Sequence, residues 1–135
     1  MNPLTSVAPS PTTSRPVTVL LIEDDRAVRE PIKQFLERSN YRVLAAENAE
    51  EALLLWTGYR SAIGAVVSDC DLGDGPTGLS VLREIHRSTP SLPLVLASGS
   101  LTPALVIELE RTTAIKCLPK PFGLAELLAF LPRKA

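Results

Sequence analysis

Short apolar runs recur along the chain, and the first of them, at 17–22, shows no alternation between apolar and polar positions. A strand of this kind is buried on both faces, as in a parallel sheet that helices cover on each side. Similar runs occur at 41–46, 63–67, 94–97 and 115–118. Segments with the spacing of amphipathic helices separate them. We therefore predict an α/β domain in which five strands alternate with five helices around a doubly wound parallel sheet.

The expected helices show capping signals and one irregularity. Asn48 should cap the second helix, with Glu51 placed three residues later for a capping-box-like partnership. Thr102 followed by Pro103 is another favourable helix start. Pro31 lies inside the first helix, and its missing N–H should kink or loosen the first turns unless the helix starts late.

Residues 1–16 differ from the rest of the chain, because they contain four prolines among Ser and Thr and almost no large apolar side chains. Such a segment cannot bury enough apolar surface to offset the entropy of ordering it. We interpret 1–16 as a flexible tail or linker, and 17–135 as one folded domain.

The composition narrows the function classes. The net charge of −1 and the absence of a basic block argue against direct binding of nucleic acid. No stretch is long and apolar enough to span a membrane, and no signal peptide is visible, so we expect a cytoplasmic protein without membrane contact. Cys70 and Cys117 are too few for a disulfide framework, and both are interpreted as small, reduced, buried residues.

Polar residues that carry chemistry follow four of the five expected strands. Glu23 and Asp24 follow the first strand, Asp69 ends the third, Ser98 ends the fourth and Lys120 follows the fifth. In doubly wound sheets the ligand site lies beyond the carboxyl ends of the strands, so we expect these side chains to converge.

Three converging carboxylates repel one another unless a cation neutralises them. Mg²⁺ suits such a site, since it prefers hard oxygen ligands and keeps several waters. Asp69 is also well placed as a carboxylate nucleophile that forms an acyl phosphate. A metal, a Lys ammonium and a hydroxyl donor would supply the positioning and charge neutralisation that phosphoryl transfer requires.

Residues 17–131 resemble a response-regulator receiver domain of two-component signalling, the CheY-like family. The matching segments are 20–25, 66–69, 94–99 and 120–122. The resemblance implies a flavodoxin-like fold with strand order 2-1-3-4-5. This order is taken from the family and not from the residues.

The resemblance also implies a role for each strand-end residue. Asp69 would be the phosphoacceptor, and Glu23 and Asp24 the acidic pair that binds Mg²⁺, with the backbone carbonyl of Asp71 as a further ligand. Ser98 and Lys120 would each contact a phosphoryl oxygen. The side chains of Asp71 and Ser100 would flank the phosphoryl group and tune its hydrolysis. The peptide bond between Lys120 and Pro121 is typically cis in this family.

A partner phosphohistidine, on a histidine kinase or a histidine phosphotransfer protein, is the expected donor. By resemblance, the output face comprises the fourth helix, the fifth strand and the fifth helix. Because the sequence ends at Ala135, we expect the signal to pass to another, unknown protein. The domain could equally be the receiver portion of a hybrid kinase.

Three positions depart from the family pattern. Gly73 stands where the loop after the phosphoacceptor usually has Pro, and the loop at 74–78 is one residue longer than is common. Cys117 replaces the Tyr or Phe that many relatives use to couple activation to the Ser or Thr. Pro119 precedes Lys120 and biases Leu118 toward an extended conformation.

Two alternatives remain open. Asp69 and Asp71 spell Asp-x-Asp, which resembles the nucleophile motif of haloacid-dehalogenase-type phosphatases, but that motif usually ends the first strand. A receiver-like module that binds partners without being phosphorylated is the other alternative. We expect no independent substrate turnover. We interpret His86 as a helix-surface residue rather than a phosphohistidine.

Overall fold

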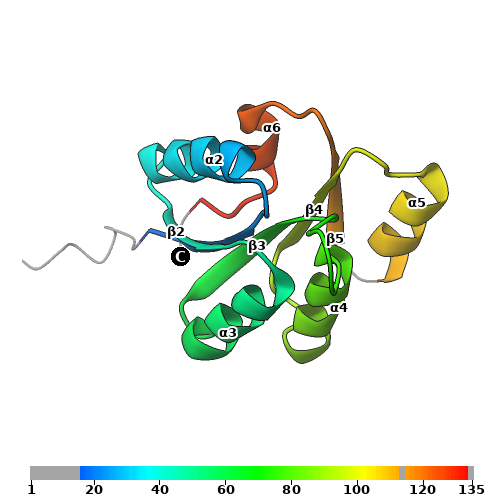
Figure 1. The fold of residues 1–135 in the computed structure, drawn as a ribbon, viewed down its shortest axis with the longest axis horizontal. Helices are drawn as coiled ribbons and strands as arrows, with labels where there is room; N and C mark the ends of the chain where they lie inside the picture. Colours follow the sequence, from blue (N-terminus) through cyan, green and yellow to red (C-terminus); the bar gives the residue numbers. More distant parts are fainter. Residues whose placement is uncertain (1–15, 113–114, 134–135) are drawn as a thin grey trace, which may run out of the picture.

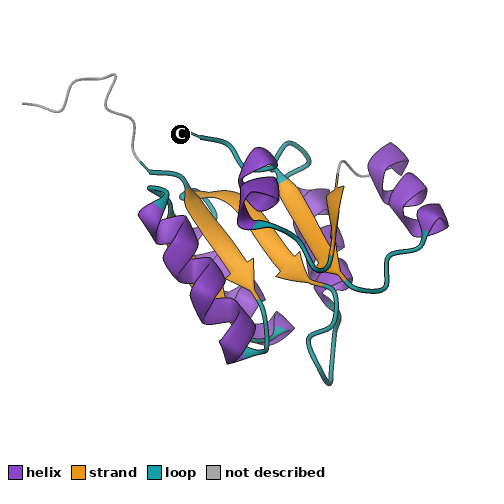
Figure 2. Ribbon diagram, turned by 90° about the horizontal axis from the view of Figure 1, so that it is seen from above, coloured by secondary structure: helices purple, strands orange, loops and turns teal. Residues whose placement is uncertain are grey.

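One parallel sheet forms the centre of the molecule, which we describe from a computed structural model over residues 16–112 and 115–133. Five strands lie in the order β2-β1-β3-β4-β5, as the resemblance implied. All paired strands are parallel, and their arrows point the same way in Figure 2. The expected tail at 1–16 lies, apart from Pro16, outside the described residues.

Strands and helices alternate strictly along the described chain (Figure 1). The strands are β1 (Thr18–Ile22), β2 (Arg42–Ala46), β3 (Ile63–Asp69), β4 (Leu94–Ser98) and β5 (Ile115–Pro119). The helices are α2 (Arg26–Arg38), α3 (Ala49–Tyr59), α4 (Gly78–Ser88), α5 (Pro103–Thr112) and α6 (Leu124–Ala129). These bounds agree with the predicted elements to within a few residues.

Helices cover both faces of the sheet, which explains why the strands lack alternation. In Figure 1, α2 and α6 lie above the sheet and α3 and α4 below it. Leu20 and Val66 point into the core shared with α3, α4 and α5. Their neighbours Val19 and Val67 point into the core shared with α2 and α6. Since both faces of the central strands exclude water, their positions favour apolar side chains.

The predicted caps are present, with one difference in geometry. The Asn48 side chain accepts a hydrogen bond from the Glu51 N–H at 2.8 Å. The Glu51 carboxylate accepts from the N–H of Glu47 at 2.7 Å, one residue earlier than in a standard capping box. Thr102 Oγ1 accepts from the Leu105 N–H at 3.2 Å. The contacts of Asn48 and Thr102 each satisfy an N–H that the helix itself leaves unpaired.

Pro31 does not delay the start of its helix. Asp25 caps α2 by accepting from the Ala27 N–H at 2.9 Å, and the helix continues through Pro31 to Arg38. Proline removes one donor to the preceding turn, but the buried residues Ile32 and Leu36 hold this helix against the sheet. Packing therefore outweighs the local defect.

The described helices are all shorter or less apolar than a membrane-spanning helix has to be.

Candidate functional site

Strand register brings the strand-end residues to one edge of the sheet. Ile22 of β1 pairs with Ser68 of β3, so Glu23 and Asp69 are the next residues on neighbouring strands. Asp69 pairs with Ala97, and Ser98 is the residue that follows. Ser98 in turn pairs with Pro119, which directly precedes Lys120. The central position of β3 gives Asp69 neighbours on both sides.

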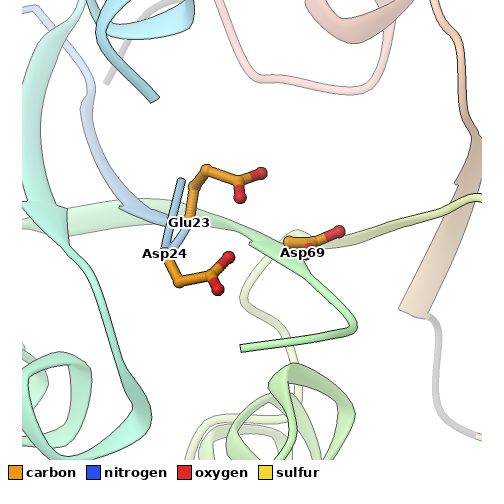
Figure 3. A group of neighbouring side chains, drawn as sticks. All are labelled: Glu23, Asp24 and Asp69. Carbon is orange, nitrogen blue, oxygen red and sulfur yellow. The ribbon is translucent and has the colours of Figure 1, made fainter. Parts of the chain in front are cut away.

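Three carboxylates meet at this edge. One oxygen from each of Glu23, Asp24 and Asp69 lies within 4.8 Å of the other two. In Figure 3 the side chains of Glu23 and Asp24, from the end of β1, extend toward Asp69 at the end of β3. Asp24 is exposed and Asp69 is half-buried, so the cluster faces solvent on one side.

Lys120 neutralises part of this negative charge. Its Nζ lies 2.8 Å from Asp69 Oδ1 and 3.4 Å from Glu23 Oε1. Burial lowers the pKa of Lys120, but the hydrogen bond to Asp69 and the charge of Glu23 outweigh this effect and raise it. The ammonium therefore stays charged at neutral pH, and two carboxylates share it.

Glu23 is the most enclosed of the three acids, with 4% of the residue exposed. Its burial raises the pKa of the carboxyl group, and the nearby charge of Asp69 adds to the effect. The N–H of Asp25 donates to Glu23 Oε2 at 3.2 Å and acts in the opposite direction. A cation bound nearby would therefore stabilise the ionised form of this buried carboxyl group.

Ser98 connects Lys120 with the loop that leads to α5. Its backbone carbonyl accepts from the Lys120 N–H at 2.9 Å. Its Oγ accepts from the Ser100 N–H at 3.0 Å, and the residue is buried. A displacement of Ser98 would therefore be transmitted both to Lys120 and to the start of α5.

The loop after Asp69 is shaped by its own polar groups. Asp71 Oδ1 accepts from the Gly73 N–H at 3.2 Å, so the Asp71 side chain caps the turn. Gly73 has φ +78° and Gly75 has φ +92°, conformations that proline cannot adopt and other residues rarely do. The departure from the family's Pro at position 73 thus accompanies a different backbone path. Gly73 also passes close to Asp24, since a Cβ there would lie 3.7 Å from Asp24 Oδ2.

Two residues that support the site were not predicted. Gly78, the first residue of α4, packs so tightly that a Cβ there would overlap the carbonyl oxygen of Asp69. Arg29, in the first turn of α2, donates from Nη1 to the Glu23 carbonyl oxygen at 2.8 Å. A glycine at the start of a helix and an arginine near a helix N-terminus were the available sequence signals.

Cys117 lines an apolar groove of about 400 Å³ between α5 and β5, together with Val106, Ile107 and Pro119. Burial raises the pKa of the Cys117 thiol, and the same holds for Cys70, which is only half-buried. Both cysteines are free, and Cys117 fits the predicted small buried residue better than Cys70 does. His86 lies on α4 as predicted, but it is half-buried rather than a plain surface residue, and its Nδ1 is buried.

The donor set fits Mg²⁺. Three carboxylates on one side of a half-open site leave room for waters, which Mg²⁺ retains in most protein sites. Neither a histidine nor a cysteine belongs to the cluster. The site therefore offers hard oxygen ligands, which suit Mg²⁺ better than they suit softer metals.

The peptide bond between Lys120 and Pro121 is cis, as the resemblance implied.

A family model described as the response regulator receiver domain matches residues 19–131 of this chain. The chain belongs to this receiver-domain family. The match covers all five strands apart from Thr18 and places the acidic cluster, Ser98 and Lys120 inside the family's domain.

Curated relatives and solved structures agree with this assignment. The chain is 39% identical over 115 residues to the response regulator MprA of Mycolicibacterium vanbaalenii, covering 84% of this chain and 48% of MprA. It is 35% identical over 112 residues to the sensor kinase CckA of Brucella abortus, covering 82% of this chain and 12% of CckA. The non-phosphorylated HemR receiver domain from Leptospira biflexa has a TM-score of 0.75 and 30% identity, with 84% of this chain and 90% of that one covered.

The chain spans less than half the length of these curated relatives. Segments similar to this chain therefore occur both in a response regulator and in a sensor kinase.

Proposed function

We propose that this receiver domain accepts a phosphoryl group on Asp69 from a phosphohistidine of a partner protein and signals through a change in conformation. The observation that carries the proposal is the contact between Lys120 Nζ and Asp69 Oδ1, inside a cluster of three carboxylates within 4.8 Å. A cation-binding pocket and a fixed ammonium are the two sources of positive charge that phosphoryl transfer needs.

The proposed step forms a bond between phosphorus and an Asp69 carboxylate oxygen while the bond between phosphorus and the donor's imidazole nitrogen breaks. The imidazole leaves with the electron pair and takes up a proton from solvent as required. Glu23, Asp24, Asp69 and the backbone carbonyl of Asp71 would hold Mg²⁺, which would offset the negative charge of the phosphoryl oxygens. The protein supplies orientation and charge rather than covalent chemistry.

Lys120 and Ser98 would contact the phosphoryl group once it is attached to Asp69. With phosphate on Asp69, the ammonium has a new acceptor for its hydrogen bond, and the Ser98 hydroxyl can donate to another phosphoryl oxygen. Because these contacts exist only in the phosphorylated state, they favour a different conformer of the β4–α5 loop. The face formed by α5, β5 and α6 adjoins this loop and is the proposed output surface.

An apolar groove beside Lys120 offers the donor protein an approach to Asp69. The groove has a volume of about 480 Å³ and lies between α2 and the segment after β5. Val28, Ile32 and Phe122 line it together with Lys120. A histidine kinase or histidine phosphotransfer protein docked there would hold its imidazole near the acceptor. We propose a cytoplasmic location for this exchange, and no independent turnover of a substrate.

The central test is incubation with acetyl phosphate and Mg²⁺, followed by intact mass measurement of the wild type and Asp69→Asn. Wild type should gain one phosphoryl group and the variant none. Equal gain by the variant, or no gain by the wild type, would contradict the proposal. Turnover of a generic phosphate ester would instead support the phosphatase alternative. A folded chain without Mg²⁺ affinity would support a module that only binds partners.

The approach surface has its own test, with a histidine kinase already shown to phosphorylate the wild type. Val28→Glu places a charge in the groove beside Lys120 and should slow transfer from the kinase at least several-fold. Phosphorylation by acetyl phosphate should be unchanged. Ile107→Glu, in the groove beside Cys117, is the matched control and should leave both rates unchanged. Equal effects of the two substitutions on the kinase reaction would contradict the assignment.

A further inference from the structure

Arg29 donates hydrogen bonds to three consecutive carbonyl groups of the acidic segment. Its Nη1 lies 2.8 Å from the carbonyl oxygen of Glu23 and 3.4 Å from that of Asp24. Its backbone N–H donates to the carbonyl oxygen of Asp25 at 2.8 Å. Arg29 thus contacts all three carbonyl groups of residues 23–25, which we call the acidic segment. This segment supplies two of the three clustered carboxylates.

The position of Arg29 is unfavourable for the helix itself. The first turn of α2 contains no acidic residue, although the positive end of a helix dipole favours negative charge there. Arg29 lies in that turn and is not a free surface cation, because 12% of its side chain is exposed. Its Nε lies 3.8 Å from a carboxylate oxygen of the adjacent Glu30, too long for a strong contact. The carbonyl contacts are what compensate for burying the guanidinium.

We propose that Arg29 is a positioning residue that fixes the peptide planes after β1, and so aims the Glu23 and Asp24 carboxylates at the Mg²⁺ site. The inference rests on the proposed function, in which that site binds Mg²⁺. A peptide plane that rotates carries the attached Cα–Cβ bonds with it, so the two guanidinium hydrogen bonds limit where both carboxylates lie, in addition to the backbone bond to Asp25 that other residues at position 29 would also make. Arg29 touches neither the cation nor the phosphoryl group and acts through the residues that do.

Geometry and charge make opposite predictions for this residue. If Arg29 acted only as a positive charge near the cluster, its removal would relieve repulsion and tighten Mg²⁺ binding. If it acts through the carbonyl contacts, its removal frees the acidic segment and weakens Mg²⁺ binding. The direction of the change therefore separates the two roles.

Arg26 provides a matched control. It lies in the same first turn of α2 and carries the same charge, but its side chain is exposed. Arg26→Met and Arg29→Met remove the same charge from the same turn, and only Arg29→Met also removes the contacts with Glu23 and Asp24. Arg29→Lys keeps the charge, but its shorter side chain ends in an ammonium without the planar geometry that holds Nη1 against both carbonyl groups.

The experiment measures the dissociation constant for Mg²⁺, with MgCl2 alone, by isothermal titration of the four proteins. Outer contacts of metal ligands typically change affinity ten-fold or more, so we expect Arg29→Met to raise the dissociation constant about ten-fold. Arg29→Lys should have an intermediate effect, and Arg26→Met should bind as tightly as wild type or slightly tighter. Unchanged or tighter binding by Arg29→Met would overturn the inference while leaving the Mg²⁺ site intact.

A second readout needs no metal. The Asp25 N–H donates to Glu23 Oε2, so its hydrogen exchange in the metal-free protein reports whether the acidic segment is held. We expect exchange to be at least several-fold faster in Arg29→Met and unchanged in Arg26→Met. If wild type failed to bind Mg²⁺, the proposed function would fail. Equal exchange rates in the two variants would separately overturn the positioning role.

Discussion

Lys120 Nζ lies 2.8 Å from Asp69 Oδ1 and joins the end of β5 to the end of the central strand. The contact crosses β4, whose last residue, Ser98, accepts a backbone hydrogen bond from the same lysine. Lys120 is therefore held by its main chain while its ammonium reaches the acidic cluster.

Replacing Lys120 with Met should destabilise the metal-free protein, because Asp69 and Glu23 then lose their shared cation. The side chain is 29% exposed, which allows solvent to compensate in part, so we expect a loss of about 1 kcal/mol in the free energy of unfolding. Urea denaturation at pH 7 measures it. Lys116→Met is the control, since Lys116 is an exposed lysine on the same strand. Equal losses in the two variants would show that the contact with Asp69 contributes nothing.

The raised pKa of Glu23 predicts how stability depends on pH. Because the folded protein holds this proton more tightly than the unfolded chain, the metal-free wild type should lose stability as pH rises from about 4.5 through the folded pKa of Glu23. Glu23→Gln lacks this titration, so its stability relative to wild type should increase over the same window. Urea denaturation across a pH series measures the difference.

Mg²⁺ provides the control for that prediction. A bound cation favours the ionised carboxylate, so saturating MgCl2 at neutral pH should stabilise wild type more than Glu23→Gln. A constant difference between the two proteins at every pH, with and without Mg²⁺, would mean that Glu23 does not titrate in this range.

Gly78→Ala should be strongly destabilising, since its Cβ would overlap the carbonyl oxygen of Asp69 and lie 2.9 Å from the carbonyl carbon. Neither atom can move without displacing the strand end, so we expect a loss of about 2–3 kcal/mol and slower phosphorylation of Asp69. Gly58→Ala is the matched control, because Gly58 lies inside α3 with nothing within 4 Å of the added Cβ. This control should be stabilised by about 0.5–1 kcal/mol. Thermal unfolding of both variants gives the comparison.

Gly73→Ala should cost about 1 kcal/mol, because φ +78° is a left-handed conformation that disfavours a Cβ. Gly99→Ala, which meets no atom within 4 Å, should be close to neutral. Urea denaturation distinguishes them. If strain in this loop also moves Gly73 away from Asp24, the Gly73 variant should bind Mg²⁺ with altered affinity as well. Equal stabilities of the two variants would contradict the importance of the left-handed turn.

The sequence was most informative at positions where a reactive polar residue ends or directly follows a predicted strand. Glu23, Asp69, Ser98 and Lys120 could be placed together because parallel strands end at one edge of a sheet, and each lies within a few residues of a strand end. The spacing of these residues along the sequence did not reveal the distances between their side chains. The pairing of Lys120 with Asp69 needed the register of two strand pairs at once, β3 with β4 and β4 with β5.

The supporting residues were harder to predict for a physical reason. Arg29 and Gly78 contact backbone carbonyl groups of other segments. Because every residue has such a group, the sequence does not show which of them will be contacted. Pro31 left open a late helix start, but the helix begins at Arg26, and the buried Ile32 and Leu36 hold it against the sheet. The hydrogen bond from the Gly73 N–H to the Asp71 side chain was not predicted from the sequence either.

The pairing of Glu23 with Lys120 spans a sequence separation of 97 residues. During synthesis the acidic segment emerges early and its cation last, so the full set of contacts cannot form until β5 has joined the sheet. Contacts between distant residues are made late in folding, after the cost of closing long loops has been met. A fragment that ends before β5 would therefore carry the carboxylates without the lysine that restrains them, so the complete site would form only once all five strands have paired.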